Sequence, residues 1–166
     1  MKILVTGSES FVGKELISQC LKNNISVVGC DAIDNKNPSY DFYKLDICSK
    51  EFPSEIFKDV DIVIHLAWQG IPDYSEKISR TNLYNSINFF EFIFGNTNCK
   101  KVLVAGSCLE YGKKKGICKE SDPVHIESYF TWAKHSLNQY LTIKCAEKNV
   151  VLNWFRLFYV YGPGQR

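Results

Sequence analysis

The sequence has no long apolar run and almost no net charge. No apolar run in its 166 residues approaches the roughly 18 residues that a membrane-spanning helix needs. Only Met1, Lys2 and three apolar residues precede Thr6, which is too little for a signal peptide. The formal charge of +2 does not favour nucleic acid or an anionic membrane as a partner. The lysines at 113–115 are expected to be a solvated loop tip rather than a phosphate site.

Paired cysteine motifs are absent as well. The seven cysteines are an odd number, and no two of them form CxxC, so neither a disulfide framework nor a zinc site is expected. Cys20, Cys30, Cys99 and Cys145 lie in apolar segments, where a thiol behaves as a small hydrophobic side chain. These features favour a reducing compartment, and we expect a cytoplasmic protein that holds no metal.

Strand and helix signals alternate along the whole chain. Short apolar or β-branched runs predict strands at 2–6, 25–30, 43–45, 60–67, 101–106 and 150–157. Helical spacing of apolar residues predicts helices at 11–23, 75–94 and 130–148, the second of them ended by Gly95. This alternation predicts a three-layer α/β fold: a mostly parallel, doubly wound sheet of about six strands with helices on both faces. Without an internal linker, residues 1–166 form one domain.

The stretch TGSESFVG follows the first predicted strand and opens the first predicted helix. In such a loop Gly7 permits the tight turn and Gly13 lets the helix pack against the sheet. Ser10 stands where a middle glycine normally admits a pyrophosphate, but its hydroxyl can itself donate to a phosphate. The first N–H groups of the helix, at Phe11 and Val12, also favour an anion. The loop therefore predicts a dinucleotide site.

Asp31 follows the second predicted strand. A carboxylate at this point accepts hydrogen bonds from the ribose 2′-OH and repels a 2′-phosphate, so NAD is favoured over NADP. The alternative is a chance turn followed by a chance acidic residue. Because the loop, its position and the acid occur together, we favour the NAD site.

Eight segments occur in one order and at one set of spacings. They are TGSESFVG, Asp31, LDI at 45–47, HLAW at 65–68, Asn82, GSCLEYG at 106–112, Lys134 and RLFYVYGPGQ at 156–165. This set resembles the extended short-chain dehydrogenase/reductase family, the NAD-dependent epimerases and dehydratases of nucleotide sugars. The resemblance covers essentially the whole chain. It implies a Rossmann sheet, a bound NAD, and transient oxidation of a sugar by hydride transfer.

The resemblance also assigns residues to the site. The positions that it implies for cofactor contacts are Asp46, Ile47, Leu66 and Ala67. Ser107 has the spacing of the family's catalytic serine or threonine; the alternative is a strand-end serine that caps its own turn. Tyr159 stands where the family has a substrate-side asparagine, a departure from the pattern.

A second departure concerns the catalytic pair. The family's tyrosine and lysine lie four residues apart on one helix, which turns both side chains the same way. Lys134 matches the lysine, which binds the nicotinamide ribose, although a solvated helix lysine is the alternative. Phe130 stands in the tyrosine position without the phenolic oxygen. Tyr129 is expected to lie about 140° round the helix from Lys134. Loss of a positioned acid–base group costs about 10²–10⁴-fold in rate.

Three functions remain open. The first is the cofactor domain of an epimerase, dehydratase or reductase that acts on a sugar nucleotide. The second is a non-catalytic NAD-binding sensor or regulator, and the third is a Rossmann module used only for association. The family's substrate-closing portion lies beyond the matched residues, so we expect this chain alone to turn over little or nothing. The retained Asp31 makes the association module the least favoured of the three.

A homodimer through helices 75–94 and 130–148 is the partner expectation. Family members often pair these helices in a four-helix bundle. The first helix has a stripe of Leu83, Ile87, Phe90 and Phe94. Further apolar residues fall outside this stripe, namely Phe89, Phe92 and Ile93. Such a helix is buried at an interface or in a core, and core packing is the alternative.

Overall fold

A computed structural model describes residues 1–49 and 51–165. Its six strands form one parallel sheet in the order β3-β2-β1-β4-β5-β6. They are β1 (Lys2–Thr6), β2 (Ser26–Asp31), β3 (Asp41–Lys44), β4 (Ile62–His65), β5 (Lys101–Ser107) and β6 (Val151–Leu157). The predicted doubly wound α/β fold is confirmed, and every strand pair of the sheet is parallel.

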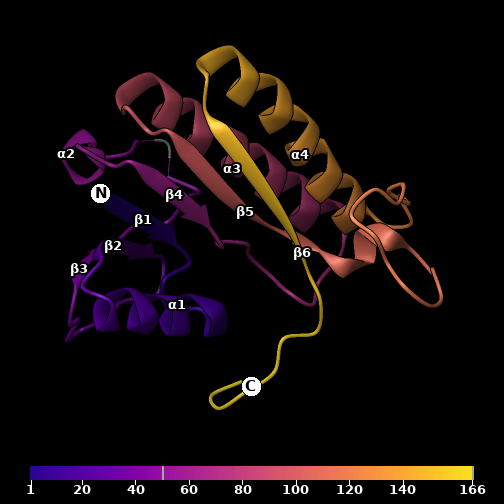
Figure 1. The fold of residues 1–166 in the computed structure, drawn as a ribbon, viewed down its shortest axis with the longest axis horizontal. Helices are drawn as coiled ribbons and strands as arrows, with labels where there is room; N and C mark the ends of the chain where they lie inside the picture. Colours follow the sequence, from indigo (N-terminus) through magenta and orange to yellow (C-terminus); the bar gives the residue numbers. More distant parts are fainter. Residues whose placement is uncertain (50, 166) are drawn as a thin grey trace.

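Helices cover both faces of this sheet. They are α1 (Phe11–Lys22), α2 (Ser54–Phe57), α3 (Glu76–Asn96), α4 (Tyr129–Lys148) and the 3₁₀ helix η1 (Cys108–Tyr111). Helices α3 and α4 lie side by side on one face, and α1 lies on the other (Figure 1). The strand order reverses at β1, with β2 on one side and β4 on the other. In open α/β sheets, ligands bind at the carboxyl ends of the strands beside such a reversal.

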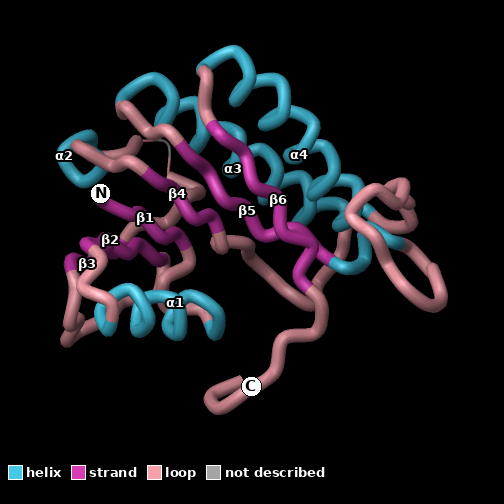
Figure 2. Tube along the Cα trace, viewed as in Figure 1, coloured by secondary structure: helices cyan, strands magenta, loops and turns pink. Residues whose placement is uncertain are grey.

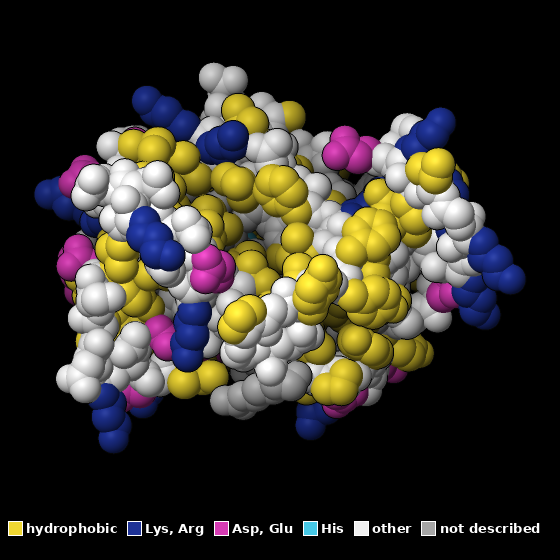
Figure 3. Space-filling model, turned by 60° about the horizontal axis from the view of Figure 1, so that its bottom comes forward, with side chains coloured by type: hydrophobic (Ala, Val, Ile, Leu, Met, Phe, Trp, Pro, Cys, Tyr) yellow, Lys and Arg dark blue, Asp and Glu magenta, His cyan; other side chains and the backbone are white. Residues whose placement is uncertain are grey.

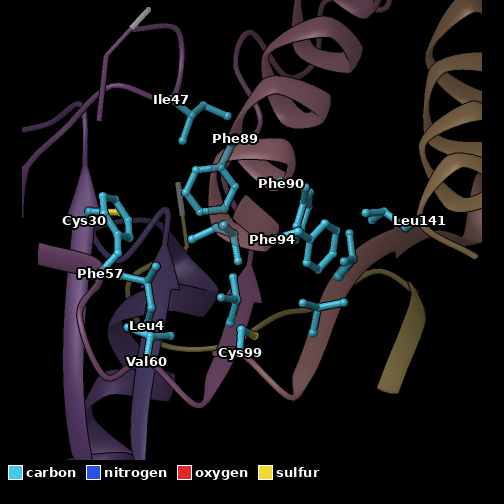
Figure 4. Close-up of a cluster of buried hydrophobic side chains, with 14 of the residues drawn as sticks. Leu4, Cys30, Ile47, Phe57, Val60, Phe89, Phe90, Phe94, Cys99 and Leu141 are labelled. Carbon is cyan, nitrogen blue, oxygen red and sulfur yellow. The ribbon is translucent and has the colours of Figure 1, made fainter. Parts of the chain in front are cut away.

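The main core fills the space between the sheet and the two long helices. Figure 4 shows aromatic side chains from α3 meeting apolar side chains from the strands. Phe57, Phe89, Phe90 and Ile93 are fully buried. Burial of one such side chain contributes about 1.5–3 kcal/mol, so this layer supplies a large part of the stability of the fold. The four cysteines expected in apolar surroundings are buried too.

The buried face of α3 differs from the predicted stripe. Phe89 and Ile93, expected outside the stripe, are fully buried, whereas Leu83 and Ile87 are only partly buried. The buried face also carries polar residues, namely Ser79, Asn82, Asn85 and Ser86. Apolar spacing missed this face because these polar groups lie next to the candidate site, where hydrogen bonds satisfy most of them.

One predicted helix end needs correction, and one short helix was not predicted. Gly95 does not end α3, which runs to Asn96 and is capped by Thr97. The Thr97 N–H and hydroxyl both donate to the Ile93 carbonyl, at 3.0 and 2.8 Å, so a left-handed glycine is not needed. The short helix α2 had no sequence prediction, because four residues are too few to show a helical period. Among the described residues, no helix has the length and hydrophobicity needed to span a membrane.

Candidate functional site

The loop between β1 and α1 requires glycine at its first position for two reasons. Gly7 has a φ of +69°, a left-handed conformation that L side chains rarely adopt. A Cβ at this position would lie 2.9 Å from the Ala67 backbone nitrogen. The same glycine therefore makes the turn and lets the loop lie against the segment that follows β4. In this way Leu66 and Ala67, two of the predicted cofactor contacts, come to lie beside the loop.

Ser10 does not need to be glycine here. Its φ of −69° and ψ of 166° are extended values open to any residue, and its hydroxyl oxygen accepts a hydrogen bond from the Gly13 N–H at 3.1 Å. Ser10 is thus the N-cap of α1, and its hydroxyl hydrogen remains free to donate. The N–H groups of Phe11 and Val12 occupy the first turn, which has no intrahelical acceptors.

Gly13 has a different role from the predicted one. A Cβ here would overlap the carbonyl oxygen of Gly7 and lie 2.8 Å from that of Ser8. The missing side chain therefore lets α1 approach its own preceding loop rather than the sheet. The result is a compact cradle, with free N–H donors, at the positive end of the helix dipole.

Asp31 ends β2 beside this cradle. One carboxylate oxygen accepts the Glu9 N–H and the other accepts the Ile33 N–H, both at 2.9 Å. These bonds fix the carboxylate, and each oxygen keeps a second lone pair for a ribose hydroxyl. The position and the fixed orientation fit the predicted ribose contact.

Asp46 and Ile47 follow β3, and their side chains lie in different surroundings. Asp46 is half-buried and accepts the Cys48 N–H at 2.9 Å. The Ile47 side chain is packed into the core. Any ligand contact at Ile47 must therefore use its backbone.

A buried histidine, His65, links the loop to α3, although no motif in the sequence assigns it a role. The His65 ring nitrogens pair with the Thr6 hydroxyl at 2.9 Å and the Ser86 hydroxyl at 3.1 Å. The Thr6 hydroxyl oxygen also accepts the Ala67 N–H at 3.3 Å. Burial, together with the charge of Lys134, lowers the pKa of His65 to about 3. His65 is therefore a neutral connector that holds the end of β4 in place.

Asn82 on α3 holds the same segment from its other end. Its side-chain oxygen accepts the Gln69 N–H at 2.7 Å, and its amide donates to the Gln69 and Ile78 carbonyls at 3.0 and 2.9 Å. All three partners are backbone groups: two belong to Gln69 and one to the preceding turn of α3. Asn82 thus positions the backbone that follows Ala67.

Phe130 and Lys134 face one cluster of side chains. The ammonium of Lys134 donates to the Ala105 carbonyl at 2.7 Å and lies 3.7 Å from the centroid of the Trp68 ring. The Phe130 ring packs edge-on against Trp68, with 5.7 Å between centroids, and against Tyr74 at 4.9 Å. Burial lowers the pKa of Lys134 to about 7, and the nearby charge of Glu110 only partly opposes this. Lys134 is therefore not a solvated helix lysine.

The Tyr129 side chain points away from the Lys134 cluster, as its position on the helix predicted. It is 53 % exposed and lines a groove between α3 and α4 with Tyr74, Arg80 and Trp132. The spacing argument that groups Phe130 with Lys134 and separates Tyr129 from them therefore agrees with the structure.

Ser107 ends β5 on the strand that carries the Lys134 acceptor. Its hydroxyl oxygen accepts the Leu109 N–H at 3.2 Å and caps η1, which leaves its hydrogen free. The fully buried Glu110 completes the cap by accepting the Ser107 N–H at 2.8 Å. The Glu110 carboxylate also accepts from Trp154 at 3.1 Å and lies 3.5 Å from Arg156. The spacing Ser-x-x-Glu signals this cap in the sequence.

Tyr159 lies beyond β6 and is 85 % exposed. It belongs to the segment that leaves the sheet and runs to the C-terminal end of the described chain (Figure 2). Among the described residues, no cluster of histidine, cysteine, aspartate or glutamate side chains could hold a metal ion.

The strand order, the glycine cradle at its reversal point and the acid that ends β2 together define a dinucleotide-binding Rossmann protein. The NAD dependent epimerase/dehydratase family matches residues 3–166, and the chain belongs to this family. The resemblance noted in the sequence is thereby confirmed, as is NAD as the cofactor of the family. The cradle, which a Cβ at Gly7 would fill, and the fixed Asp31 carboxylate fit such a cofactor.

Individual relatives are similar to this chain over nearly its whole length. The chain is 28 % identical to a putative UDP-glucose 4-epimerase of Methanocaldococcus jannaschii, with 98 % of this chain and 57 % of the relative covered. It is 28 % identical to a dTDP-4-dehydro-6-deoxyglucose reductase of Escherichia coli, covering 99 % and 57 %. The structure of a Thermotoga maritima UDP-glucose 4-epimerase with UDP-glucose superposes with a TM-score of 0.87 at 26 % identity, covering 100 % and 58 %. The chain thus spans a little over half the length of these relatives.

Proposed function

We propose that this chain is the NAD-binding portion of a protein that acts on, or is derived from proteins that act on, a sugar nucleotide. The observation that carries the proposal is the cradle at Gly7 beside the fixed Asp31 carboxylate, at the reversal point of the sheet. The N–H groups of Phe11 and Val12 would hold the pyrophosphate, with the Ser10 hydroxyl as a further donor. Asp31 would hold the adenosine ribose, and Asp46 with the Ile47 backbone would contact the adenine.

At the other end of the cofactor, Leu66 and Ala67 would line the site and Lys134 would bind the nicotinamide ribose. When bound, NAD supplies a hydride acceptor. Ser107 keeps a free hydroxyl hydrogen that can bind a sugar oxygen. Phe130, packed on the same cluster as Lys134, would occupy the place of the family's tyrosine and cannot move a proton. This replacement supports a second candidate, a non-catalytic NAD-binding sensor or regulator.

Contacts with a sugar nucleotide would need more surface than the described residues enclose. Residues on and after β6 are widely exposed, among them Phe155, Phe158 and Tyr161. Figure 3 shows the molecule from the side of α1 and the C-terminal segment, where hydrophobic side chains gather around a hollow. An enclosed site buries most of its ligand, so the substrate-binding portion is proposed to pack on this side, with Tyr159 facing the substrate.

A second groove between α3 and α4, which adjoins the one that Tyr129 lines, is the proposed site of homodimer formation. Its lining includes Tyr84, Leu83, Ile87 and Trp132, and an exposed groove with such side chains favours a protein partner. Light scattering at tens of micromolar protein tests this, and a mass of one chain would contradict it.

We expect a cytoplasmic protein, with free thiols and soluble ligands.

Isothermal titration of the chain with NAD and with NADP tests the cofactor proposal. NAD should bind more tightly, and Asp31→Ala should weaken that preference because it removes the carboxylate that binds the ribose diol. Equal affinities for the two cofactors in the unaltered chain would refute the role given to Asp31. Absence of binding to either cofactor would refute the proposed function itself.

A further inference from the structure

Asp31 is not the only carboxylate held beside the cradle. The Glu9 N–H donates to Asp31 at 2.9 Å, so the two residues are neighbours across the loop. The Glu9 carboxylate accepts hydrogen bonds from the Tyr40 hydroxyl at 2.7 Å and from the Asn35 amide at 2.9 Å. Only 10 % of the Glu9 side chain is exposed. A second carboxylate therefore stands in a fixed position at this edge of the site.

The chain beyond Asp31 is arranged to hold this carboxylate. Tyr40 precedes β3 and its ring lies over β2 at Gly29, where a Cβ would overlap the ring. Glycine in the interior of a strand weakens the strand and commonly marks such a close approach. The Tyr40 hydroxyl reaches both Glu9 and, at 3.3 Å, the Ser8 hydroxyl. The glycine therefore makes room for the ring that fixes Glu9.

Glu9 stays charged in this setting. Burial raises its pKa, but hydrogen bonds from Tyr40 and Asn35 and the charge of Lys14 outweigh burial, so the net pKa lies below its usual value. The ammonium of Lys14 lies 3.5 Å from the Glu9 carboxylate, and this lysine side chain is 64 % exposed. Glu9 is thus paired with the Lys14 ammonium, an exposed positive charge that could otherwise attract a phosphate.

We propose that Glu9 is a second determinant of cofactor choice, and that its carboxylate, with that of Asp31, excludes a 2′-phosphorylated ribose from this edge of the site. The proposal rests on the proposed NAD-binding function. A 2′-phosphate placed here would meet two fixed negative charges instead of one. It would also find Lys14 already paired.

Glu9→Gln is the direct test because it removes the charge and keeps the shape. The measured quantity is the ratio of the dissociation constant for NADP to that for NAD. We expect Glu9→Gln to lower this ratio about tenfold, mainly by strengthening NADP binding. The effect should depend only weakly on salt, since buried charges such as the Glu9 carboxylate are screened much less than exposed ones. The matched control is Glu15→Gln on α1, an exposed glutamate that pairs with Gln19, which should leave the ratio within about twofold.

Combination with Asp31→Asn separates the two carboxylates. Asp31→Asn alone should retain part of the NAD preference because Glu9 remains, and the double variant should lose the rest. A melting temperature measured for each variant shows that the fold is intact. If Glu9→Gln has the same ratio as the unaltered chain while that chain binds NAD, the proposal is overturned and the proposed function stands. If the unaltered chain binds neither cofactor, the proposed function fails instead.

Discussion

The ammonium of Lys134 lies 3.7 Å from the centroid of the Trp68 ring. The ammonium donates a hydrogen bond to the Ala105 carbonyl, at 2.7 Å. An aromatic face attracts a cation, but it stabilises the charge less than water or a carboxylate does. The buried lysine is therefore held in place while its charged form is destabilised. Phe130, which also packs on Trp68, adds no polar group to this cluster.

Replacement of Lys134 by methionine should change how stability depends on pH. Burial lowers the pKa of Lys134 to about 7 from its usual 10.5. Between these values the unfolded chain binds a proton that the folded chain does not. The free energy of unfolding should therefore rise with pH from about 7 to about 10.5, by up to about 1.4 kcal/mol per pH unit from this group. Urea denaturation at several pH values should show that Lys134→Met lacks this contribution, whereas parallel curves would contradict the lowered pKa.

Alanine at Gly7 should disrupt both the fold of the loop and cofactor binding. It combines a strained φ with a close approach to Ala67. The control is Gly116→Ala, since Gly116 also has a positive φ, of +87°, but has open space around it. Gly116→Ala should cost about 1 kcal/mol of stability. We expect Gly7→Ala to cost clearly more and to abolish NAD binding in a titration. Equal losses of stability would mean that the approach to Ala67 is unimportant.

Removal of the Asn82 side chain should loosen the segment that follows β4. Asn82→Ala leaves the Gln69 N–H and carbonyl without their partners, at a cost of about 1–3 kcal/mol. Hydrogen exchange followed by mass spectrometry should show faster exchange across residues 66–70. Asn88→Ala, at an exposed position on the same helix, is the control and should change neither quantity measurably. Unchanged exchange in Asn82→Ala would show that the segment is held by other contacts.

A phenol at position 130 should restore proton transfer where a substrate can be bound. In a chimera that continues from β6 into the C-terminal portion of a UDP-glucose 4-epimerase, Phe130→Tyr should raise hydride transfer from a sugar nucleotide to NAD. The expected gain is on the order of 10²-fold or more. NADH absorbance in single-turnover experiments measures it.

Lys134→Met in the same chimera should remove that gain and weaken NAD binding. If the chimera with Phe130 already reacts at the rate of the Phe130→Tyr form, the proton comes from another group. Tyr129 is then the first residue to replace, although its exposed side chain lines the α3–α4 groove rather than the Lys134 cluster.

Local pattern was enough to predict the elements that build the site. The β1 loop, the acid after β2 and the four-residue spacing of Phe130 and Lys134 are features of short segments, so they could be interpreted without a structure. The buried face of α3 could not, because its polar residues look exposed in the sequence. Ser86, for instance, is fully buried since it pairs with His65 from β4.

The sequence by itself determined the strand–helix alternation, the glycine loop and the positions of the candidate site residues along the chain, because these depend on backbone geometry over a few neighbouring residues. Only the tertiary structure decided what surrounds those positions. The strand order brings β4 next to β1, and so His65 next to Thr6. The packing of α4 places Lys134 on Trp68, and the close approach of Tyr40 to β2 fixes Glu9. These contacts join residues far apart in the chain, and they set the charge, orientation and burial of the candidate site.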